Sequence, residues 1–438
     1  MEVIILCGGL GTRLRGVVHD IPKCLAPIAG KPFLGYLLDW LGRYSVNHVV
    51  FSVGYLREQV IDFVRSREWP FSYDFAQEET PLGTGGGIRL ALGYCRENQV
   101  FVVNGDTFYP VDLERMHFEY PVTLALKPMK DFDRYGAVSV QGESDGNYFS
   151  CSCSKNQFPS DSTKSERPTS AENYFSCGCS KNQFPSDSTM PTRINAFQEK
   201  QYCAEGLING GVYAIDRSRL DLSSLPEKFS FEKEVLEPGA AIGQIGGWVS
   251  NAYFIDIGIP EDYERAQWAL PAWKAVQEAS KAVLQADAQT LFLDRDGVLN
   301  RHLLGDYVRS WAQWEWVPGI LTEIARWSAK FRHIVLVTNQ RGVGKGLMTD
   351  ADLSRIHAQM MTEILEAGGR MDLILACTAL SEEDPRRKPN PGMFLEAQAL
   401  FPDIDAKSSV LLGDSPSDAA FAVNCGMQFI LLNPEAVS

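Results

Sequence analysis

The chain has 438 residues, of which 45% are hydrophobic and 22% are charged, and its formal net charge is −14. This length and composition predict a globular protein with more than one domain, and the acidic excess argues against a nucleic-acid-binding surface. The chain has no apolar run near the roughly 18 residues of a membrane span and no signal-peptide pattern at its start. We therefore expect a cytoplasmic protein with reduced cysteines and with neither nucleic acid nor a membrane as a partner.

The chain from its start to about residue 135 alternates short apolar segments with amphipathic ones, which is typical of a parallel α/β sheet. Strands are predicted at Val3–Leu6, His48–Val53 and Val100–Val103, and helices at Phe33–Arg43 and Arg57–Arg65. Residues 133–260 contain more glycine, serine and strand-forming residues. The stretch Ala266–Gln285 predicts a helix that Pro271 interrupts, and its position indicates a connector between domains.

One polar segment repeats itself. The sequence NYFSCSCSKNQFPSDST begins at Asn147 and recurs from Asn173 with one difference, Ser152 against Gly178. A segment with so few aliphatic residues cannot build its own core. We interpret residues 147–191 as an insertion at the tip of a hairpin that would otherwise turn around Asp145-Gly146.

Each copy of the repeat carries a Cys-x-Cys pair, and the four thiols are Cys151, Cys153, Cys177 and Cys179. Four thiolates can form a tetrahedral zinc site. Because Cys-x-Cys is rarer than Cys-x-x-Cys in structural zinc sites, a duplicated loop without metal is the favoured interpretation. A partner-binding arm is a third one.

A second α/β pattern begins at Thr290. Strands are predicted at the start of TLFLDRDGVLN, at His333–Asn339, at Met371–Thr378 and at Ser409–Asp414. The two patterns together predict an α/β protein with two Rossmann-like, three-layer αβα domains. We expect a first domain at residues 1–265, a helical linker at 266–287 and a second domain at 288–438.

The first strand runs into the glycine-rich loop CGGLGTRL, a pattern typical of phosphate binding. A dinucleotide-binding loop would need a third glycine at Leu14, and a Walker loop would need Lys-Ser/Thr after Gly11. The remaining interpretation uses the backbone amides from Gly8 to Thr12 as a nest for phosphate oxygens. Arg13 would add a bidentate contact and Lys23 a point charge.

This loop, followed by Pro22-Lys23, resembles the signature of sugar-1-phosphate nucleotidyltransferases, which have a GT-A-like fold. Further stretches are similar to the branch that makes GDP-D-glycero-α-D-manno-heptose, namely EETPLGTGGGIRLAL, VVNGDTFYPVD, ALKPMKDFDRYGAV, LINGGVYAID and YFIDIGIPEDYERAQ. The resemblance covers roughly residues 1–270 apart from the insertion. It implies that a sugar 1-phosphate attacks the α-phosphorus of a nucleoside triphosphate, GTP in this branch, and that pyrophosphate leaves.

The resemblance also implies roles for individual residues. Asp106 and Asp256 would hold Mg2+, while Arg13 and Lys23 would neutralise the triphosphate and the leaving pyrophosphate. The phosphate cradle would be Gly8, Gly9, Gly11 and Thr12; the base would approach Gly83, Thr84 and Gly85; the sugar pocket would include Gly136, Glu199 and Asn209.

For several of these positions, the residues alone are also consistent with a purely structural or surface role. Asp106 and Asp256 could each cap a turn. Lys23 could be a solvated surface lysine, and Glu199 is almost as readily a surface carboxylate.

In the second half, FLDRDGVLN places Asp294 and Asp296 two residues apart at the end of an apolar strand. Two carboxylates this close repel each other, which favours a bound cation or a shared proton. Thr338 in VTNQ, Lys388 in RRKPNPGM, and Asp414 with Asp418 in GDSPSD follow in order. This four-part pattern resembles the haloacid dehalogenase-like phosphatases and covers residues 290–438.

That resemblance implies a two-step hydrolysis. Asp294 would attack phosphorus to form an aspartyl phosphate, and Asp296 would protonate the leaving oxygen and then activate water. Asp294, the backbone carbonyl of Asp296, and Asp414 would hold Mg2+. Thr338 and Lys388 would bind the phosphoryl oxygens, and Asp418 would orient Lys388 or a metal-bound water.

Within this superfamily, HLLGDYV, VTNQRGVGKG and RRKPNPGMF are similar to the D-glycero-D-manno-heptose 1,7-bisphosphate phosphatases, in which Arg387 would contact substrate phosphate. Many relatives carry a zinc loop of four Cys and His ligands. Here those positions are Cys377, Ala379, Asp384 and Arg386, so we expect no zinc there and some change in loop geometry.

The two resemblances support each other, because removing the 7-phosphate from heptose 1,7-bisphosphate yields the sugar 1-phosphate that the first domain would use. We therefore expect a multifunctional enzyme with small-molecule substrates, and the sequence leaves homo-oligomer formation open. The first alternative is a transferase for mannose or glucose 1-phosphate fused to a histidinol-phosphate or other phosphomonoester phosphatase. The second is a regulatory protein that binds nucleotide sugars without turnover.

Overall fold

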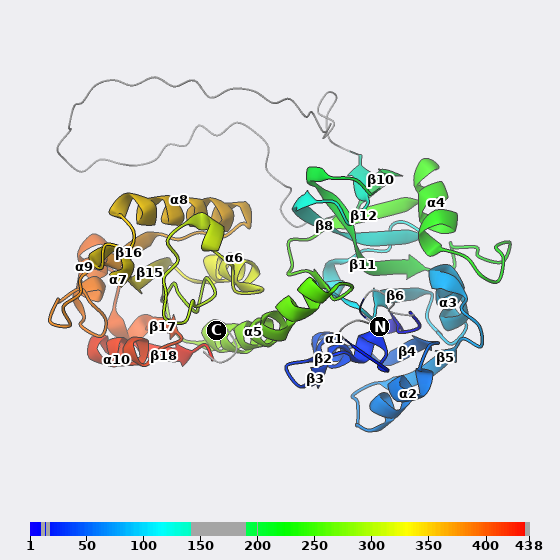
Figure 1. The fold of residues 1–438 in the computed structure, drawn as a ribbon, viewed down its shortest axis with the longest axis horizontal. Helices are drawn as coiled ribbons and strands as arrows, with labels where there is room; N and C mark the ends of the chain where they lie inside the picture. Colours follow the sequence, from blue (N-terminus) through cyan, green and yellow to red (C-terminus); the bar gives the residue numbers. More distant parts are fainter. Residues whose placement is uncertain (10–13, 15–17, 142–189, 199, 434–438) are drawn as a thin grey trace, which may run out of the picture.

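A computed structural model describes residues 1–9, 14, 18–141, 190–198 and 200–433. It confirms the predicted α/β class: the described residues form a nine-stranded sheet in the first half and a five-stranded sheet in the second. Figure 1 shows the two sheets with their helices as separate bodies joined by one long helix, α5.

In the first sheet, the strand that precedes the glycine-rich loop has a neighbouring strand on each side. β1 (Glu2–Leu6) pairs in parallel with β4 (His48–Val53) on one side and β6 (Gln99–Asn104) on the other, and β5 (Ser72–Gln77) continues this parallel half. The other half contains β11 (Cys203–Asp216), β8 (Val122–Phe132), β12 (Ile245–Val249), β10 (Thr192–Phe197) and β9 (Ala137–Val140), in that spatial order.

Alternation along β1 gives this domain its three layers. Val3 and Ile5 share a buried cluster with α1 (Phe33–Leu41) and α2 (Arg57–Arg65), whereas Ile4 faces α3 (Gly83–Leu92) and the segment of η3 (Glu232–Leu236) and α4 (Glu237–Ala241). Successive side chains of a strand point to opposite faces, so a fully apolar strand is covered on both. Short elements complete the domain: η1 (Lys23–Leu25), β2 (Pro27–Ile28), β3 (Lys31–Pro32), β7 (Thr107–Phe108), η2 (Leu113–Arg115) and β13 (Ile255–Asp256).

The strands that flank the duplicated segment pair with each other. β9 and β10 are antiparallel, with Ile194 opposite Val140 and Phe197 opposite Val138. The two ends of the inserted stretch therefore leave the sheet side by side, as in a hairpin. The repeats themselves, including the four cysteines of the candidate zinc site, lie outside the described residues.

The second sheet is parallel throughout, in the order β16 (Leu373–Cys377), β15 (His333–Asn339), β14 (Thr290–Leu293), β17 (Ser409–Gly413) and β18 (Gln428–Leu431). One face packs on α5, α6 (Ile320–Lys330) and α8 (Asp350–Glu366), the other on α9 (Gly392–Leu400) and α10 (Pro416–Cys425). The remaining elements are η4 (Trp311–Gln313), α7 (Arg341–Gly344) and η5 (Ala406–Ser408).

The connector α5 (Pro260–Gln285) belongs to both domains. Its first half contributes Tyr263, Leu270 and Trp273 to the first core, and its second half contributes Val276 and Val283 to the second. The predicted interruption at Pro271 is wrong, because the helix continues through that residue. Proline removes one backbone hydrogen bond, and the buried neighbours on both sides hold the helix together.

The position of α5 suits the division that the sequence predicts, and we propose domains at 1–265 and 288–438 with residues 266–287 as the linker. None of the helices in the described ranges is long and apolar enough to cross a membrane.

Candidate active sites

The first candidate site forms where two distant strand ends meet. Asp106 follows β6, and Asp256 ends β13, whose pairing with β7 places Asp256 opposite Thr107. Lys23 at the start of η1 reaches both carboxylates, with its Nζ 2.6 Å from an oxygen of Asp106 and 3.4 Å from an oxygen of Asp256. Three residues that the sequence assigned to one reaction thus lie together.

Charge and burial shift the pKa of two of these groups. Burial raises the pKa of Asp256, and the negative charge of Asp106 raises it further. Burial by itself would lower the pKa of Lys23, but the two carboxylates outweigh burial and raise it. The lysine therefore stays protonated between its partners. Its single positive charge does not neutralise two carboxylates, so the pair can also bind a divalent cation.

The glycine-rich loop begins beside a carboxylate that the sequence analysis missed. A Cβ on Gly8 would lie 2.8 Å from Oε1 of Glu78, and a Cβ on Gly87 would meet the same atom at the same distance. A side chain at either position would therefore displace the Glu78 carboxylate from this place. Glu78 stands in the quoted stretch EETPLG, but a carboxylate in a loop gave no sign of this placement. Gly11, Thr12 and Arg13 lie outside the described residues, and Gly9 has open space around it.

The predicted base-binding stretch has a packing role as well. Gly83 has a positive φ of 74°, and a Cβ there would lie 2.6 Å from the carbonyl oxygen of Phe229. Gly85 faces the Phe229 ring, and the Thr84 hydroxyl accepts a hydrogen bond from the Phe231 amide. These contacts give the three residues a structural reason to be small or polar, and their contact with a base stays a prediction.

The predicted sugar pocket is described in part. A Cβ on Gly136 would lie 2.6 Å from the carbonyl oxygen of Gln198, so no side chain fits there. Asn209 is held within its own strand, donating to the hydroxyl of Tyr213 and accepting from the amide of Gly211. Glu199 lies outside the described residues. β9 and β11 pair with Ala137 opposite Ile208, so Gly136 and Asn209 lie next to each other at this end of the pairing, and their contact with a sugar stays a prediction.

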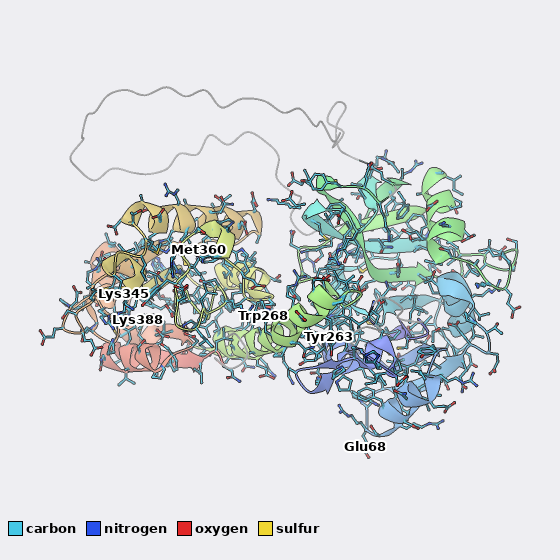
Figure 2. The ribbon with its side chains drawn as sticks, viewed as in Figure 1. Glu68, Tyr263, Trp268, Lys345, Met360 and Lys388 are labelled. Carbon is cyan, nitrogen blue, oxygen red and sulfur yellow. The ribbon has the colours of Figure 1, made fainter. Side chains whose placement is uncertain are left out.

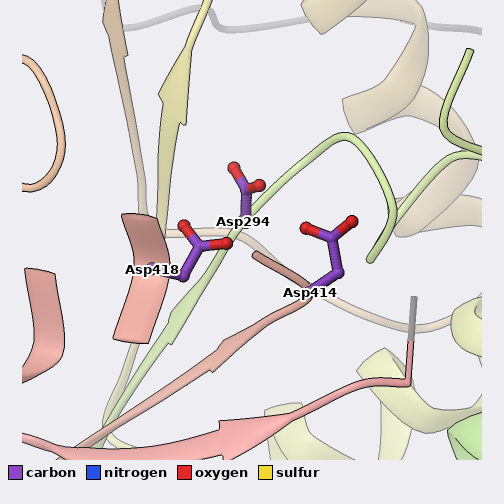
Figure 3. A group of neighbouring side chains, drawn as sticks. All are labelled: Asp294, Asp414 and Asp418. Atoms are coloured by element: carbon purple, nitrogen blue, oxygen red, sulfur yellow. The ribbon is translucent and has the colours of Figure 1, made fainter. Parts of the chain in front are cut away.

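The second candidate site collects carboxylates at the carboxyl edge of the parallel sheet. Asp294 follows β14, Asp414 follows β17, and Asp418 lies in α10; oxygens of all three lie within 4.8 Å of one another. Figure 3 shows the three side chains converging from these separate elements. A Cβ on Gly297 would lie 2.0 Å from Asp414, so only glycine leaves room for that carboxylate.

One buried lysine serves this cluster. Lys388 Nζ lies 2.8 Å from Asp294 and 2.6 Å from Asp418, and it also donates to the carbonyl of Val337. The backbone of Lys388 is fixed by two hydrogen bonds to the Asn339 side chain. The predicted contact of Asp418 with Lys388 is therefore present, and Asp418 also closes a capping box with Ser415.

Burial dominates the electrostatics of this cluster. It raises the pKa of Asp294 to about 7, and the neighbouring charges of Asp418 and Asp414 add to the rise, while Lys388 opposes it. His302 lies 3.4 Å from Asp414, which raises the pKa of that imidazole. One buried lysine does not balance three carboxylates, so the donor set fits a hard divalent cation such as Mg2+.

Asp296 accepts hydrogen bonds from other residues than the Asp294, Asp414 and Asp418 cluster does. Arg295, which is fully buried, donates to both of its oxygens, and Asn300 and Gln340 donate one hydrogen bond each. Burial alone would raise the pKa of Asp296, but Arg295 and the other donors lower it. The structure thus holds Asp296 in the ionised form that a general base requires. Arg295 and Gln340 stand inside the motifs DRD and TNQ, yet spacing did not reveal that they bind Asp296.

The other predicted residues of the second half surround this cluster. Thr338 is buried in β15 and accepts a hydrogen bond from Gln340. Arg387 donates to the carbonyls of Ala379 and Leu380, in the loop where we expect no zinc site. In that loop the Cys377 thiol faces Asp384 at 3.8 Å.

Comparison with known proteins finds different relatives for the two halves of the chain. Residues 3–120 match the model of the MobA-like NTP transferase domain, and residues 291–436 match that of the polynucleotide kinase 3 phosphatase. A D-glycero-α-D-manno-heptose 1-phosphate guanylyltransferase of Aneurinibacillus thermoaerophilus is 39% identical over 272 residues, 61% of this chain and 97% of the relative. A D-glycero-α-D-manno-heptose-1,7-bisphosphate 7-phosphatase of Mycobacterium tuberculosis is 42% identical over 135 residues, 31% of this chain and 71% of the relative. The crystal structure of HddC from Yersinia pseudotuberculosis has 30% identity and a TM-score of 0.46, and the match covers 61% of this chain and 97% of that one.

Proposed function

The chain belongs, through its first domain, to the D-glycero-α-D-manno-heptose 1-phosphate guanylyltransferase family, and we propose that this domain transfers GMP from GTP to that sugar phosphate, releasing pyrophosphate. The observation that carries the proposal is the position of Lys23 between Asp106 and Asp256. Two carboxylates and a lysine at one strand edge are the groups that a magnesium-bound triphosphate requires.

Each residue has a separate task in this reaction. Asp106 and Asp256 would hold Mg2+, which offsets the negative charge of the triphosphate when bound. Lys23 offsets charge on the phosphates and, because its pKa is raised, donates hydrogen bonds as an ammonium throughout the reaction. Arg13, which precedes the described Leu14, is proposed to bind the pyrophosphate that leaves.

The choice of guanine is supported by Glu78. Its Oε1 borders Gly8 and Gly87, and its Oε2 accepts a hydrogen bond from the amide of Leu82. A carboxylate accepts hydrogen bonds but donates none when ionised, so it suits the adjacent N1–H and N2–H donors of guanine. Burial raises the pKa of Glu78, and the hydrogen bonds that it accepts from Leu82 and Ser52 oppose the rise.

A substitution tests this assignment. E78Q replaces one acceptor with a donor, so we expect the ratio of kcat/KM for GTP to that for ATP to fall by about tenfold or more. E79Q is the matched control, since Glu79 is exposed and pairs with Arg57. An unchanged nucleotide ratio in E78Q would contradict the role of Glu78.

The second domain is that of a phosphatase, as its matched relatives are, and we propose D-glycero-α-D-manno-heptose 1,7-bisphosphate as its substrate. Asp294 attacks the phosphorus of the 7-phosphate, the bond from phosphorus to the sugar oxygen breaks, and Asp296 gives that oxygen a proton. Asp296 then takes a proton from water, which attacks the aspartyl phosphate and releases orthophosphate.

The surrounding residues set the conditions for both steps. Asp294, the backbone carbonyl of Asp296, and Asp414 would hold Mg2+, which offsets the charge of the phosphoryl group when bound. Thr338 and Lys388 bind phosphoryl oxygens, and Asp418 holds Lys388 in place. Arg295 keeps Asp296 ionised in the free enzyme, so substrate binding must weaken that contact before Asp296 carries a proton.

The two reactions form one sequence in which the second domain acts first. One incubation tests it: the purified protein with heptose 1,7-bisphosphate and each nucleoside triphosphate in turn, with orthophosphate, pyrophosphate and sugar nucleotide measured together. We expect all three products with GTP, and orthophosphate alone when no nucleotide is present. Pyrophosphate without any sugar nucleotide, or no orthophosphate from the bisphosphate, would contradict the proposal.

A further inference from the structure

Two cations next to the phosphatase site have no acidic partner in the part of the chain that the structure describes. Arg341 opens α7 and Lys345 follows it, and no carboxylate of the described residues lies within ion-pair distance of either side chain. The Nε of Arg341 is buried and has no hydrogen-bond partner within the described ranges. A buried N–H without a partner is unfavourable, so this group is suited to a ligand that brings its own acceptor.

The position of α7 puts these cations at the edge where the reaction occurs. Arg341 directly follows Gln340, whose amide donates to Asp296 at 2.7 Å and to Thr338 at 2.9 Å. The end of β15 therefore places Thr338 among the groups assigned to the reacting phosphate, and Gln340 and Arg341 follow directly after this strand. Lys345 and Lys388 are both labelled on this domain in Figure 2.

Two neighbouring loops fix α7 in this place. A Cβ on Gly342 would lie 3.2 Å from the ring of Tyr307, and the ammonium group of Lys345 lies 5.1 Å from the centre of that ring. A Cβ on Gly344 would lie 2.3 Å from the carbonyl oxygen of Thr378. That second loop continues to Ala379 and Leu380, whose carbonyls hold Arg387, so α7 and Arg387 meet across one loop.

We propose that Arg341 and Lys345 form, together with Arg387, the binding site for the second phosphate of a sugar bisphosphate. This inference rests on the proposed phosphatase function, and it explains how the enzyme selects a substrate with two phosphates. Lys388 and Thr338 are already committed to the phosphate that is cleaved. A second phosphate needs further donors, and a guanidinium matches phosphate oxygens in a bidentate way while an ammonium adds a point charge.

The test compares substrates with and without the second phosphate. We would measure kcat/KM for heptose 1,7-bisphosphate and heptose 7-phosphate, and in parallel for fructose 1,6-bisphosphate and fructose 6-phosphate. In R341M and in K345M we expect the ratio of bisphosphate to monophosphate to fall by about tenfold, and in the double variant by about a hundredfold. R341K, which keeps the charge, should restore part of the ratio.

K407M is the matched control, because Lys407 is an exposed lysine of η5 before β17, at the opposite edge of the same sheet. It should leave both ratios unchanged. A second readout is competitive inhibition of the phosphatase by mannose 1-phosphate, which should weaken about tenfold in R341M and not in K407M.

Each outcome bears on a different claim. If wild type prefers heptose 1,7-bisphosphate and the α7 variants keep that preference, or lose both activities equally, the second-phosphate site is wrong and the proposed function stands. If the heptose is not hydrolysed but the fructose ratio falls in the variants, the proposed substrate is wrong and the second-phosphate site stands. No preference for either bisphosphate in wild type would overturn both.

Discussion

The two candidate active sites use the same arrangement at different depths. Each places one lysine between two carboxylates, Lys23 between Asp106 and Asp256, and Lys388 between Asp294 and Asp418. The side chains of the first trio are 15%, 39% and 28% exposed, whereas those of the second are 2%, 12% and 0% exposed. The two sites therefore contain the same kind of ion pairing and differ in how far it is buried.

The difference follows from what each site admits. The proposed reaction at the first site needs room for a nucleoside triphosphate and a sugar phosphate, and its carboxylates lie close to water, which screens their charges. The carboxylates of the second site that pair with Lys388 lie where water hardly screens them. Their charges must then be balanced by Lys388 and a cation. The raised pKa of Asp294 comes first from this burial and then from the charges of Asp418 and Asp414.

The largest expected effect separates the two reactions completely. D294N removes the nucleophile of the phosphatase, so orthophosphate release should fall by about 10⁴-fold or more while nucleotidyl transfer from GTP to heptose 1-phosphate is unchanged. D106A should do the reverse. Both rates are measured on each purified variant, and the loss of both activities in a folded variant would show that the sites are not independent.

The next effect concerns stability and tests the difference in depth directly. K388M leaves Asp294 and Asp418 buried without their cation, so we expect a loss of about 3 kcal/mol in the free energy of unfolding. K23M removes the equivalent lysine from the more exposed site and should cost less than about 1 kcal/mol. Calorimetric unfolding of the two variants measures this contrast, and equal losses would contradict it.

Metal dependence should change at one site at a time. D256N removes one negative charge from the first site, so the Mg2+ concentration for half-maximal nucleotidyl transfer should rise by about tenfold, with phosphatase activity unaffected. D414N should shift the Mg2+ requirement of the phosphatase alone. Titrating Mg2+ into protein treated with a chelator, with both products followed, gives these values; a shift at both sites from one substitution would count against separate metal sites.

The smallest expected effect is on the pH dependence of stability and concerns His357, whose ring lies 3.4 Å from Arg295 in the second candidate site. Burial lowers the pKa of His357 from 6.5 to about 4, and the positive charge of Arg295 contributes. Because its pKa is lower in the folded chain than in the unfolded chain, neutral His357 contributes to the free energy of unfolding. This contribution is fully present above pH 6.5 and is lost as the pH falls towards 4. Between pH 7 and 5.5 the loss should be about 1 kcal/mol.

H357Q provides the comparison for this pH effect, because glutamine does not titrate. The difference in unfolding free energy between wild type and H357Q should narrow as the pH falls from 7 to 5.5. A difference that is independent of pH would show that His357 has the same pKa in the folded and unfolded chain.

Much of the fold could be predicted because strand and helix signals are local. The expected helix Arg57–Arg65 and strands His48–Val53 and His333–Asn339 have the same bounds in the structure. These segments combine a clear hydrophobic period with turn residues at both ends. The uninterrupted α5 was not predictable in this way, because what holds it through Pro271 is burial in two different cores.

In the candidate sites, only residues that belong to known motifs could be predicted from the sequence. The motif residues Asp294, Lys388 and Asp414 could be named from order along the chain. Glu78, Arg295 and Gln340 could not be assigned a role, since nothing in their spacing indicates which group they face. The same holds for Arg341, whose lack of a partner is visible only once its surroundings are built.

The sequence by itself determined the two α/β halves, their order and the residue types that each reaction needs, because periodicity and short motifs depend on neighbours in the chain. Tertiary structure alone decided that Lys23 meets a carboxylate 233 positions away, how deeply each lysine lies, and which side chains hold Asp296. Those properties come from strand register and packing between distant segments. They set local charge and access to water, and through them the protonation state of each group.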